Sequence, residues 1–203
     1  GNLAALIQIT VDGGPGNDTL LGSNGADLLL GGDDNDFIDG QQGNDTVFLG
    51  NGDDTFQWDP GDGSDVVEGQ AGNDTLVFNG SAASEIFDVS VNGSRVRFTR
   101  NVGNIVMDLN GLENLQVRAL AGTDIFTVND LAGTGLTNSL AAPAATLGGN
   151  TGDATADTVI INATANDDII TATLPGGLLV SGLAATVAVS GFESAALLPA
   201  GTE

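Results

Sequence analysis

The sequence predicts an all-β protein built as a β-solenoid. The chain of 203 residues contains 31 Gly and one Met, lacks Lys, and is rich in Thr, Val and Ile, a composition typical of strands and turns rather than helices. Its first third follows a nine-residue rhythm, and the rest contains a longer unit twice. Repeats of this kind are typical of solenoids, in which each repeat packs against the next.

The nine-residue rhythm runs from Gly13 to Val77 and is marked by aspartates. These aspartates are Asp18, Asp27, Asp36, Asp45, Asp54, Asp65 and Asp74. One step in the series is two residues longer, because of an insertion at 58–59. An apolar residue stands two positions after each of them, namely Leu20, Leu29, Ile38, Val47, Phe56, Val67 and Leu76. The residues before each aspartate are rich in Gly and Asn, which enter left-handed backbone conformations at low cost.

This spacing predicts one coil of the solenoid for every two repeats. A six-residue turn leads into a short strand whose middle residue points inward, because side chains alternate along a strand. Loops two repeats apart then stack on one side, and the seven apolar residues form the core. The outward residues Leu28, Leu30 and Phe48 are also apolar, so we expect a later segment or a neighbouring molecule to cover them.

The charge of the chain indicates a bound cation. The net charge is −23, and residues 1–80 hold fifteen acidic and no basic side chains. Stacked rows of aspartates repel one another, so a cation must lie between the loops. Oxygen donors without His or Cys favour a hard cation, and irregular loop carbonyls suit Ca²⁺ better than octahedral Mg²⁺. A solenoid whose aspartate rows bind no metal is the alternative.

The stretch 13–77 closely resembles the RTX (haemolysin-type) calcium-binding nonapeptide repeat of secreted bacterial proteins. The resemblance implies a right-handed parallel β-roll with each Ca²⁺ between two stacked loops. One loop supplies the carbonyls of its second and fourth positions and the Asp at its sixth. The next loop in the stack supplies the carbonyls of its first and third positions and its own Asp.

Carried onto this chain, the resemblance implies about five calcium sites on two sides of the roll. The ligands on one side are Gly14, Gly16 and Asp18 with Gly31, Asp33 and Asp36; then Gly32, Asp34 and Asp36 with Leu49, Asn51 and Asp54; then Gly50, Gly52 and Asp54 with Gly69, Ala71 and Asp74. Those on the other side are Ser23, Gly25 and Asp27 with Gly40, Gln42 and Asp45; then Gln41, Gly43 and Asp45 with Pro60, Asp62 and Asp65. Asp34 and Leu49 replace usual glycines, and the insertion at 58–59 is expected to disturb the sites that span it.

Two regions are predicted, the calcium-binding roll at 1–80 and a β-rich region at 81–203. The second region contains two copies of a unit of about 45–50 residues, at about 74–124 and 157–203, since Asp74–Asn79 matches Asp157–Asn162. Its expected strands are 85–91, 94–99, 104–109, 114–118, 158–162, 168–173, 178–181, 185–190 and 194–198.

A variable segment at about 129–156, rich in Gly and Ala and containing Pro143, is expected to be a loop. The favoured fold of 81–203 is a degenerate β-solenoid with hairpins, continuous with the roll; a separate small β-sandwich is the alternative. The second copy stops at Gly201–Glu203, where the first continues into Ile125–Val128. We therefore expect the chain to be part of a longer protein.

The composition also limits the function. The net charge of −23 argues against nucleic acid as a partner, and no run of 18 apolar residues could span a membrane. Without His or Lys the chain lacks the usual general base and Schiff-base residues, so we expect no enzyme activity. The predicted function is a calcium-binding structural and folding module of a secreted or surface bacterial protein.

The alternative function is a carbohydrate- or surface-binding module in which calcium serves only stability. Arg95, Arg97 and Arg100 would then bind an acidic polysaccharide. The competing interpretation is that these arginines dock onto the acidic roll or face solvent.

Overall fold

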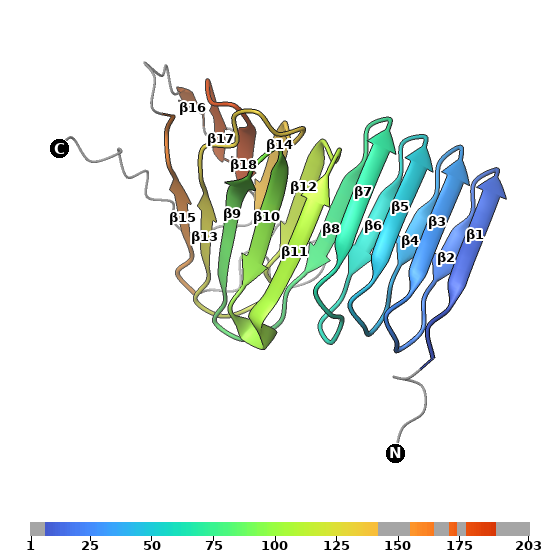
Figure 1. The fold of residues 1–203 in the computed structure, drawn as a ribbon. Coiled ribbons are helices and arrows are strands. Elements are labelled where there is room, and N and C mark those ends of the chain that lie inside the picture. Colours follow the sequence, from blue (N-terminus) through green and yellow to red (C-terminus); the bar gives the residue numbers. More distant parts are fainter. Residues whose placement is uncertain (1–6, 142–154, 165–170, 174–177, 190–203) are drawn as a thin grey trace.

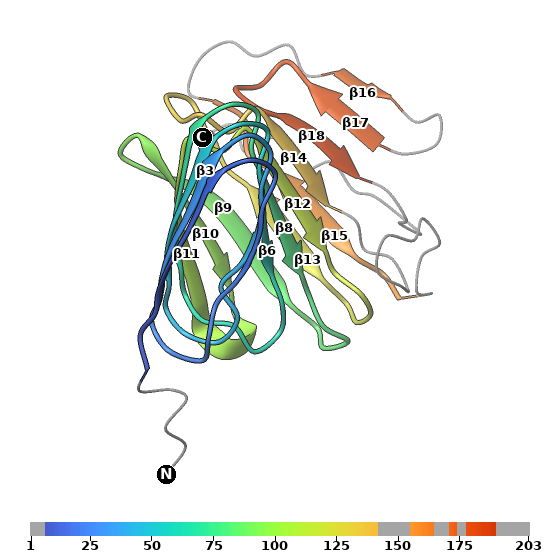
Figure 2. The same cartoon turned by 90° about the vertical axis from the view of Figure 1, so that its right-hand side faces the viewer.

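In this computed structural model the described residues are 7–141, 155–164, 171–173 and 178–189. Their strands form two nine-stranded sheets (Figure 1). Seen along the molecule, the two sheets face each other (Figure 2). The described part contains one short 3₁₀ turn, Val102–Asn104, and none of its helices is long and apolar enough to cross a membrane.

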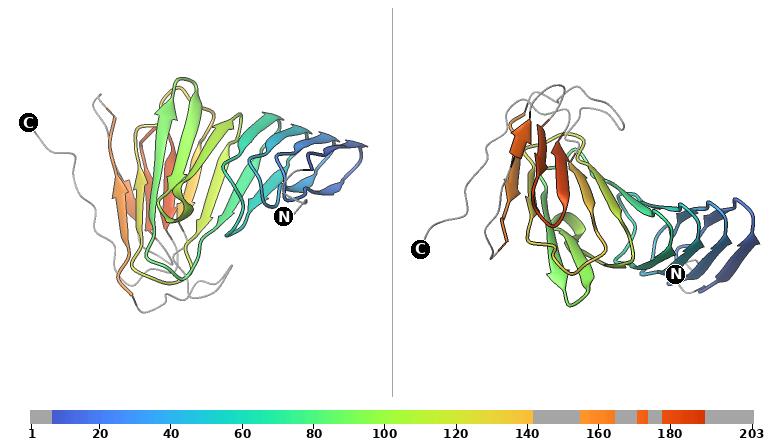
Figure 3. Two further views of the ribbon diagram at one scale, coloured as in Figure 1. Left: turned by 60° about the horizontal axis from the view of Figure 1, so that its bottom comes forward. Right: turned by 90° about the horizontal axis from the view of Figure 1, so that it is seen from above.

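The first sheet, sheet A, begins at β1 and ends at β15. In spatial order it contains β1 (Thr10–Pro15), β3 (Leu28–Asp33), β5 (Thr46–Asn51), β7 (Val66–Ala71), β11 (Ile105–Asn110), β10 (Arg95–Arg100), β9 (Ile86–Asn92), β13 (Ile125–Val128) and β15 (Thr158–Ile161). Its strands follow one another along the molecule, with β1 and β15 at opposite ends (Figure 3).

The second sheet, sheet B, runs beside it. In spatial order it contains β16 (Thr171–Thr173), β17 (Leu178–Ser181), β18 (Thr186–Val189), β14 (Asn138–Ala141), β12 (Asn114–Arg118), β8 (Thr75–Asn79), β6 (Thr55–Trp58), β4 (Phe37–Asp39) and β2 (Thr19–Leu21). From β1 to β8 the chain alternates between the two sheets, so two strands complete each coil.

The coils have the predicted register. Leu29 pairs with Val47 in sheet A and Ile38 with Phe56 in sheet B, 18 residues apart in each case. Across the insertion the offset becomes 20, as Val47 pairs with Val67. All seven predicted core residues are at most 3% exposed, and the prediction of a parallel β-solenoid is confirmed for the roll.

An aromatic cluster joins the roll to the rest of the chain. The rings of Trp58 and Phe78 stack with centroids 4.0 Å apart. Phe98 packs edge-on against Phe78 at 4.8 Å and stacks on Phe87 at 6.0 Å. These side chains are fully buried. They fill the core where the roll is followed by the strands β9 to β11.

The region after the roll continues both sheets. β11 pairs in parallel with β7, and β12 pairs in parallel with β8. For the described strands the interpretation as a solenoid continuous with the roll is therefore confirmed, and they form no separate sandwich. β9, β10 and β11 are antiparallel neighbours, and the predicted hairpin lies at Asn92 and Gly93, with Gly93 at φ 70°.

The two copies of the long unit are placed on opposite sheets. The segment Asp74–Asn79 contains β8 of sheet B, whereas the matching segment Asp157–Asn162 contains β15 of sheet A. Each is followed by three antiparallel strands in the other sheet, β9 to β11 in sheet A and β16 to β18 in sheet B. The expected strand 194–198 lies outside the described residues.

The segment 129–156 differs from the expected loop because it contains β14, which pairs with β12 and β18. The inward residues of β14 are the small Ser139 and Ala141, so its sequence lacks the apolar alternation that predicts a strand. The outward residues Leu28, Leu30 and Phe48 are half-buried. Figure 2 shows no described strand over this side of sheet A, and a covering molecule stays a prediction.

Candidate metal centre

The aspartates of the nonapeptide repeat form two rows inside the turns. In each row the backbone amide of one Asp donates a hydrogen bond to Oδ1 of the Asp in the next coil. The N···O distance is 2.7 Å from Asp36 to Asp54 and 3.0 Å from Asp54 to Asp74. On the other side it is 2.8 Å from Asp27 to Asp45. The carboxylates therefore tie neighbouring coils together through one oxygen each.

The second oxygen of most of these carboxylates is buried and has no hydrogen-bond partner. This holds for Oδ2 of Asp18, Asp36, Asp45, Asp54, Asp65 and Asp74. A buried polar atom without a partner is costly, and a row of them calls for a ligand. Asp27 is the exception, since its Oδ2 accepts a hydrogen bond from the Ser23 amide at 2.5 Å.

Glycine at the first loop position makes room for this oxygen. A Cβ atom on Gly31 would lie 2.6 Å from Asp36 Oδ2, and one on Gly69 would lie 2.7 Å from Asp74 Oδ2. Both distances are too short for a carbon beside an oxygen. Leu49 occupies the same position in its own loop and is fully buried, so this departure is accommodated within the core.

Burial makes the carboxylates hard to ionise in the absence of a cation. Burial raises the pKa of Asp65 to about 8; the hydrogen bond from the Asp45 amide opposes the rise and the charge of Asp45 adds to it. Burial likewise raises the pKa of Asp74 to about 7 and of Asp45 to about 6. At neutral pH a nearby positive charge would offset this cost.

Some loops contain strained residues. Asp34 has φ 72°, as expected for a residue in place of the usual fourth-position glycine. Gln41 at φ 61° and Gln70 at φ 75° occupy the second loop position in left-handed conformations, which the sequence did not indicate as strained. Only glycine adopts this conformation without a steric penalty.

The insertion is absorbed within one turn. The amide of Asp62 donates to the carbonyl of Asp59 at 3.0 Å, which closes a turn around Pro60. The stack is regular again at Ser64, whose amide donates to Asn44 Oδ1 at 2.9 Å. The loop pair 50–54 and 69–74 also spans the insertion in sequence but stays in register, with Asn51 opposite Ala71.

The predicted site residues therefore come together as stacked loops. Gly14, Gly32 and Gly50 lie opposite one another at the second position, and Asp33 and Asn51 do so at the third. Within the described residues no three acidic side chains converge as a metal site. A cation between two loops would thus depend on backbone carbonyls besides two aspartates, which is an oxygen set that Ca²⁺ accepts.

Two acidic residues that continue the rows, Glu113 and Glu85, were not predicted from the sequence. Glu113 Oε2 accepts the Asp74 amide at 2.8 Å, and Asp124 Oδ1 accepts the Glu85 amide at 2.8 Å. Asp157 Oδ1 in turn accepts the Asp124 amide at 2.9 Å. Glu113 and Glu85 lack the nine-residue spacing, and only the match of Gly111-Leu112-Glu113 with Gly191-Phe192-Glu193 in the second copy draws attention to Glu113.

The arginines are mostly engaged by acids. Arg95 contacts Glu68 at 2.7 Å through Nη1 and Asp108 at 2.6 Å through Nε. Arg100 forms a buried ion pair with Glu85, whereas Arg97 is exposed. Docking onto the acidic roll is therefore observed for Arg95, because Glu68 lies on β7.

Fold and site together define a β-solenoid whose turns carry two rows of inward carboxylates. Residues 10–38, 21–56 and 61–80 match the family model of the RTX calcium-binding nonapeptide repeat, four copies. The segment 10–80 therefore carries RTX calcium-binding nonapeptide repeats.

No curated protein matches the chain. Among solved structures it is similar to the extracellular lipase LipA from Serratia marcescens, with 12% sequence identity and a TM-score of 0.23. That similarity covers 88% of this chain and 38% of the lipase chain.

Proposed function

We propose that residues 13–77 bind calcium ions between stacked loops and that this binding drives the folding of the segment. The observation that carries the proposal is the set of buried Oδ2 atoms without a partner, on Asp18, Asp36, Asp45, Asp54, Asp65 and Asp74. Buried carboxylates are stable when paired with a cation. The absence of His and Cys from the chain favours a hard cation.

The ligands proposed for each ion are the aspartates of two stacked loops and four loop carbonyls. Asp36, Asp45 and Asp54 each belong to two of the about five proposed sites. Filling one site places such an aspartate for the next one, so binding is expected to be cooperative. A bound Ca²⁺ supplies the positive charge that the rows of carboxylates lack.

Calcium binding and folding are coupled in this proposal. The unfolded chain has no preformed site, so the binding free energy adds to the stability of the folded roll. Extracellular modules bind Ca²⁺ at about 10⁻⁴–10⁻³ M, above the free concentration inside a cell. We therefore propose a structural module of a secreted or surface bacterial protein that stays open inside the cell and folds outside.

We propose no catalytic role, because the chain contains no His, Lys or Cys to serve as base or nucleophile. Binding of an acidic polysaccharide stays a prediction. Of the three arginines behind it, Arg95 and Arg100 already contact carboxylates, and Arg97 is left as the exposed one.

The test is circular dichroism of the full chain across a calcium titration that starts from calcium-free buffer. The β signal is expected to rise steeply with calcium, and Mg²⁺ at the same concentration should not replace it. A roll that is fully ordered in excess chelator would contradict the proposal.

A further inference from the structure

Loop 80–85 has the internal hydrogen bonds of a roll loop. In loop 22–27 the Ser23 hydroxyl donates to Asp27 Oδ1 at 3.1 Å and accepts the Gly25 amide at 3.2 Å. The Ser23 amide donates to the other carboxylate oxygen of Asp27 at 2.5 Å.

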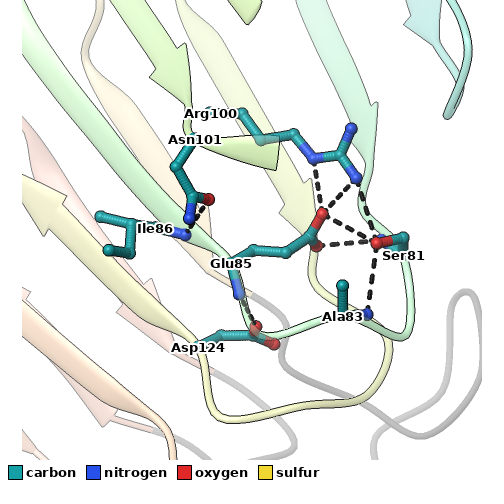
Figure 4. Close-up of polar contacts among 7 residues, drawn as sticks. All are labelled: Ser81, Ala83, Glu85, Ile86, Arg100, Asn101 and Asp124. Carbon is teal, nitrogen blue, oxygen red and sulfur yellow. Dashed lines mark hydrogen bonds and ion pairs between the residues drawn. The ribbon is translucent and has the colours of Figure 1, made fainter. Parts of the chain in front are cut away.

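The same three bonds recur in loop 80–85, with Glu in place of Asp (Figure 4). The Ser81 hydroxyl donates to Glu85 Oε1 at 3.0 Å and accepts the Ala83 amide at 3.3 Å. The Ser81 amide donates to Glu85 Oε2 at 2.9 Å. Loop 80–85 therefore has the hydrogen-bond geometry of the roll loop 22–27, although it lacks the nonapeptide sequence.

Glu85 also stands where a roll aspartate stands. Its amide donates to a carboxylate in the next coil, Oδ1 of Asp124, at 2.8 Å. A Cβ atom on Gly80 would lie 2.5 Å from Glu85 Oε2, just as a Cβ on Gly31 would meet Asp36. The Glu85 side chain is fully buried, so its carboxylate needs a cation as the roll carboxylates do.

At this loop the cation is a side chain. Arg100, the last residue of β10, donates from Nε to Glu85 Oε1 at 2.5 Å and from Nη2 to the Ser81 hydroxyl at 3.1 Å (Figure 4). Its Cζ lies 5.2 Å from the centre of the Trp58 ring, a favourable place for a cation. The Arg100 side chain is 4% exposed.

We propose that the Arg100 guanidinium is the fixed cation of loop 80–85, in the role that calcium has in the roll loops. This inference rests on the proposed function for its comparison with the roll. A cation attached to the chain is present at every calcium concentration. The strands β9 to β13 are therefore expected to stay ordered when calcium is removed, and the dependence on calcium ends before them.

The test compares the wild-type chain of 203 residues with Arg100→Gln, which leaves the charge of Glu85 without a partner, and with the double variant Glu85→Gln/Arg100→Gln, which removes both charges. Hydrogen exchange read by mass spectrometry in calcium-free buffer reports each segment separately. In the wild type, β9 to β13 should be protected from exchange. In Arg100→Gln the protection factors of these strands should fall at least about tenfold, and in the double variant they should rise again. Arg95→Gln, on the same strand, is the matched control and should stay protected.

Calcium supplies the second measurement. Equilibrium dialysis should show one more bound Ca²⁺ in Arg100→Gln than in wild type, with protection of β9 to β13 restored. Unchanged protection in Arg100→Gln, or no restoration by calcium, would overturn the inference. Loss of protection in the double variant would also overturn it, since Arg100 would then act by packing alone. Failure of the proposed function has a different signature, namely wild-type residues 13–77 whose exchange does not respond to calcium.

Discussion

The amide nitrogen of Asp45 lies 2.9 Å from Oδ1 of Asp65 and donates a hydrogen bond to it, although 20 residues separate the two along the chain. Asp45 accepts the Asp27 amide in the same way at 2.8 Å. Asp45 and Asp65 thus join neighbouring coils through Oδ1, and the Oδ2 atom of each is buried without a hydrogen-bond partner. Fold and site depend on the same side chains, and a substitution that separates the two roles is informative.

Asp45→Asn is such a substitution. Asparagine keeps an oxygen that accepts the Asp27 amide but removes the charge, and Asp45 belongs to two proposed sites. The calcium midpoint is expected to rise at least about tenfold, which corresponds to about 1.4 kcal/mol, and the transition should become less steep. Calcium titration by circular dichroism measures both.

The matched control is Asp12→Asn, because Asp12 is exposed on the outward face of β1. Its midpoint should stay within about twofold of wild type, because solvent and salt screen an exposed charge. Equal shifts in the two variants would indicate a general charge effect and argue against Asp45 as a ligand.

The calcium-free fold should be more stable in mild acid. Burial raises the pKa of Asp65 to about 8 and of Asp74 to about 7, from an ordinary value of 3.8. Between 3.8 and those values the folded chain binds more protons than the unfolded chain. The stabilisation is therefore fully present below the unfolded pKa and is lost as the pH rises through about 7 to 8.

Circular dichroism in buffer stripped of calcium by a chelating resin tests this. More ordered structure is expected at pH 5 than at pH 8, and the calcium midpoint should rise as the pH falls because protons compete for the same oxygens. If the calcium-free chain is less ordered at pH 5 than at pH 8, the ionisation of its buried carboxylates is not what destabilises the calcium-free fold.

Much of the roll could be predicted from sequence because its signals are local. The step of nine places Leu29 and Val47 in one row and Ile38 and Phe56 in another, and the observed register agrees. The same step places Asp36 and Asp54 in contact. Register in such a coil follows from alternation and turn length, which are both readable in the sequence.

The remaining features depend on contacts that no local pattern shows. β14 was missed because its inward residues Ser139 and Ala141 are small. Arg100 was grouped with Arg95 as a surface base, yet it faces inward, because alternate residues of β10 point to opposite sides. That assignment needs the partner Glu85, 15 residues away in loop 80–85.

Arg95 is expected to matter less for stability than its two ion pairs suggest. It links β10 to Glu68 on β7 and to Asp108 on β11, with a quarter of its side chain exposed. Surface ion pairs contribute about 0.2–1 kcal/mol each. Arg95→Gln should lower the free energy of unfolding by about 1 kcal/mol in saturating calcium, measured by urea denaturation. A loss above about 3 kcal/mol would show that the linkage behaves as a buried network.

Gln70→Gly is expected to stabilise the roll. Gln70 is exposed and has φ 75°, a left-handed conformation that costs a non-glycine residue about 1–2 kcal/mol. Glycine removes this strain, but it raises the conformational entropy of the unfolded chain, which costs about 0.5–1 kcal/mol of stability. The free energy of unfolding should therefore rise by about 0.5–1 kcal/mol.

The neighbouring Ala71→Gly is the control, because Ala71 is exposed without a positive φ. It should destabilise the roll by about 0.5–1 kcal/mol, and urea denaturation at saturating calcium should show opposite signs for the two variants. Destabilisation by both would mean that the left-handed turn at Gln70 carries no strain.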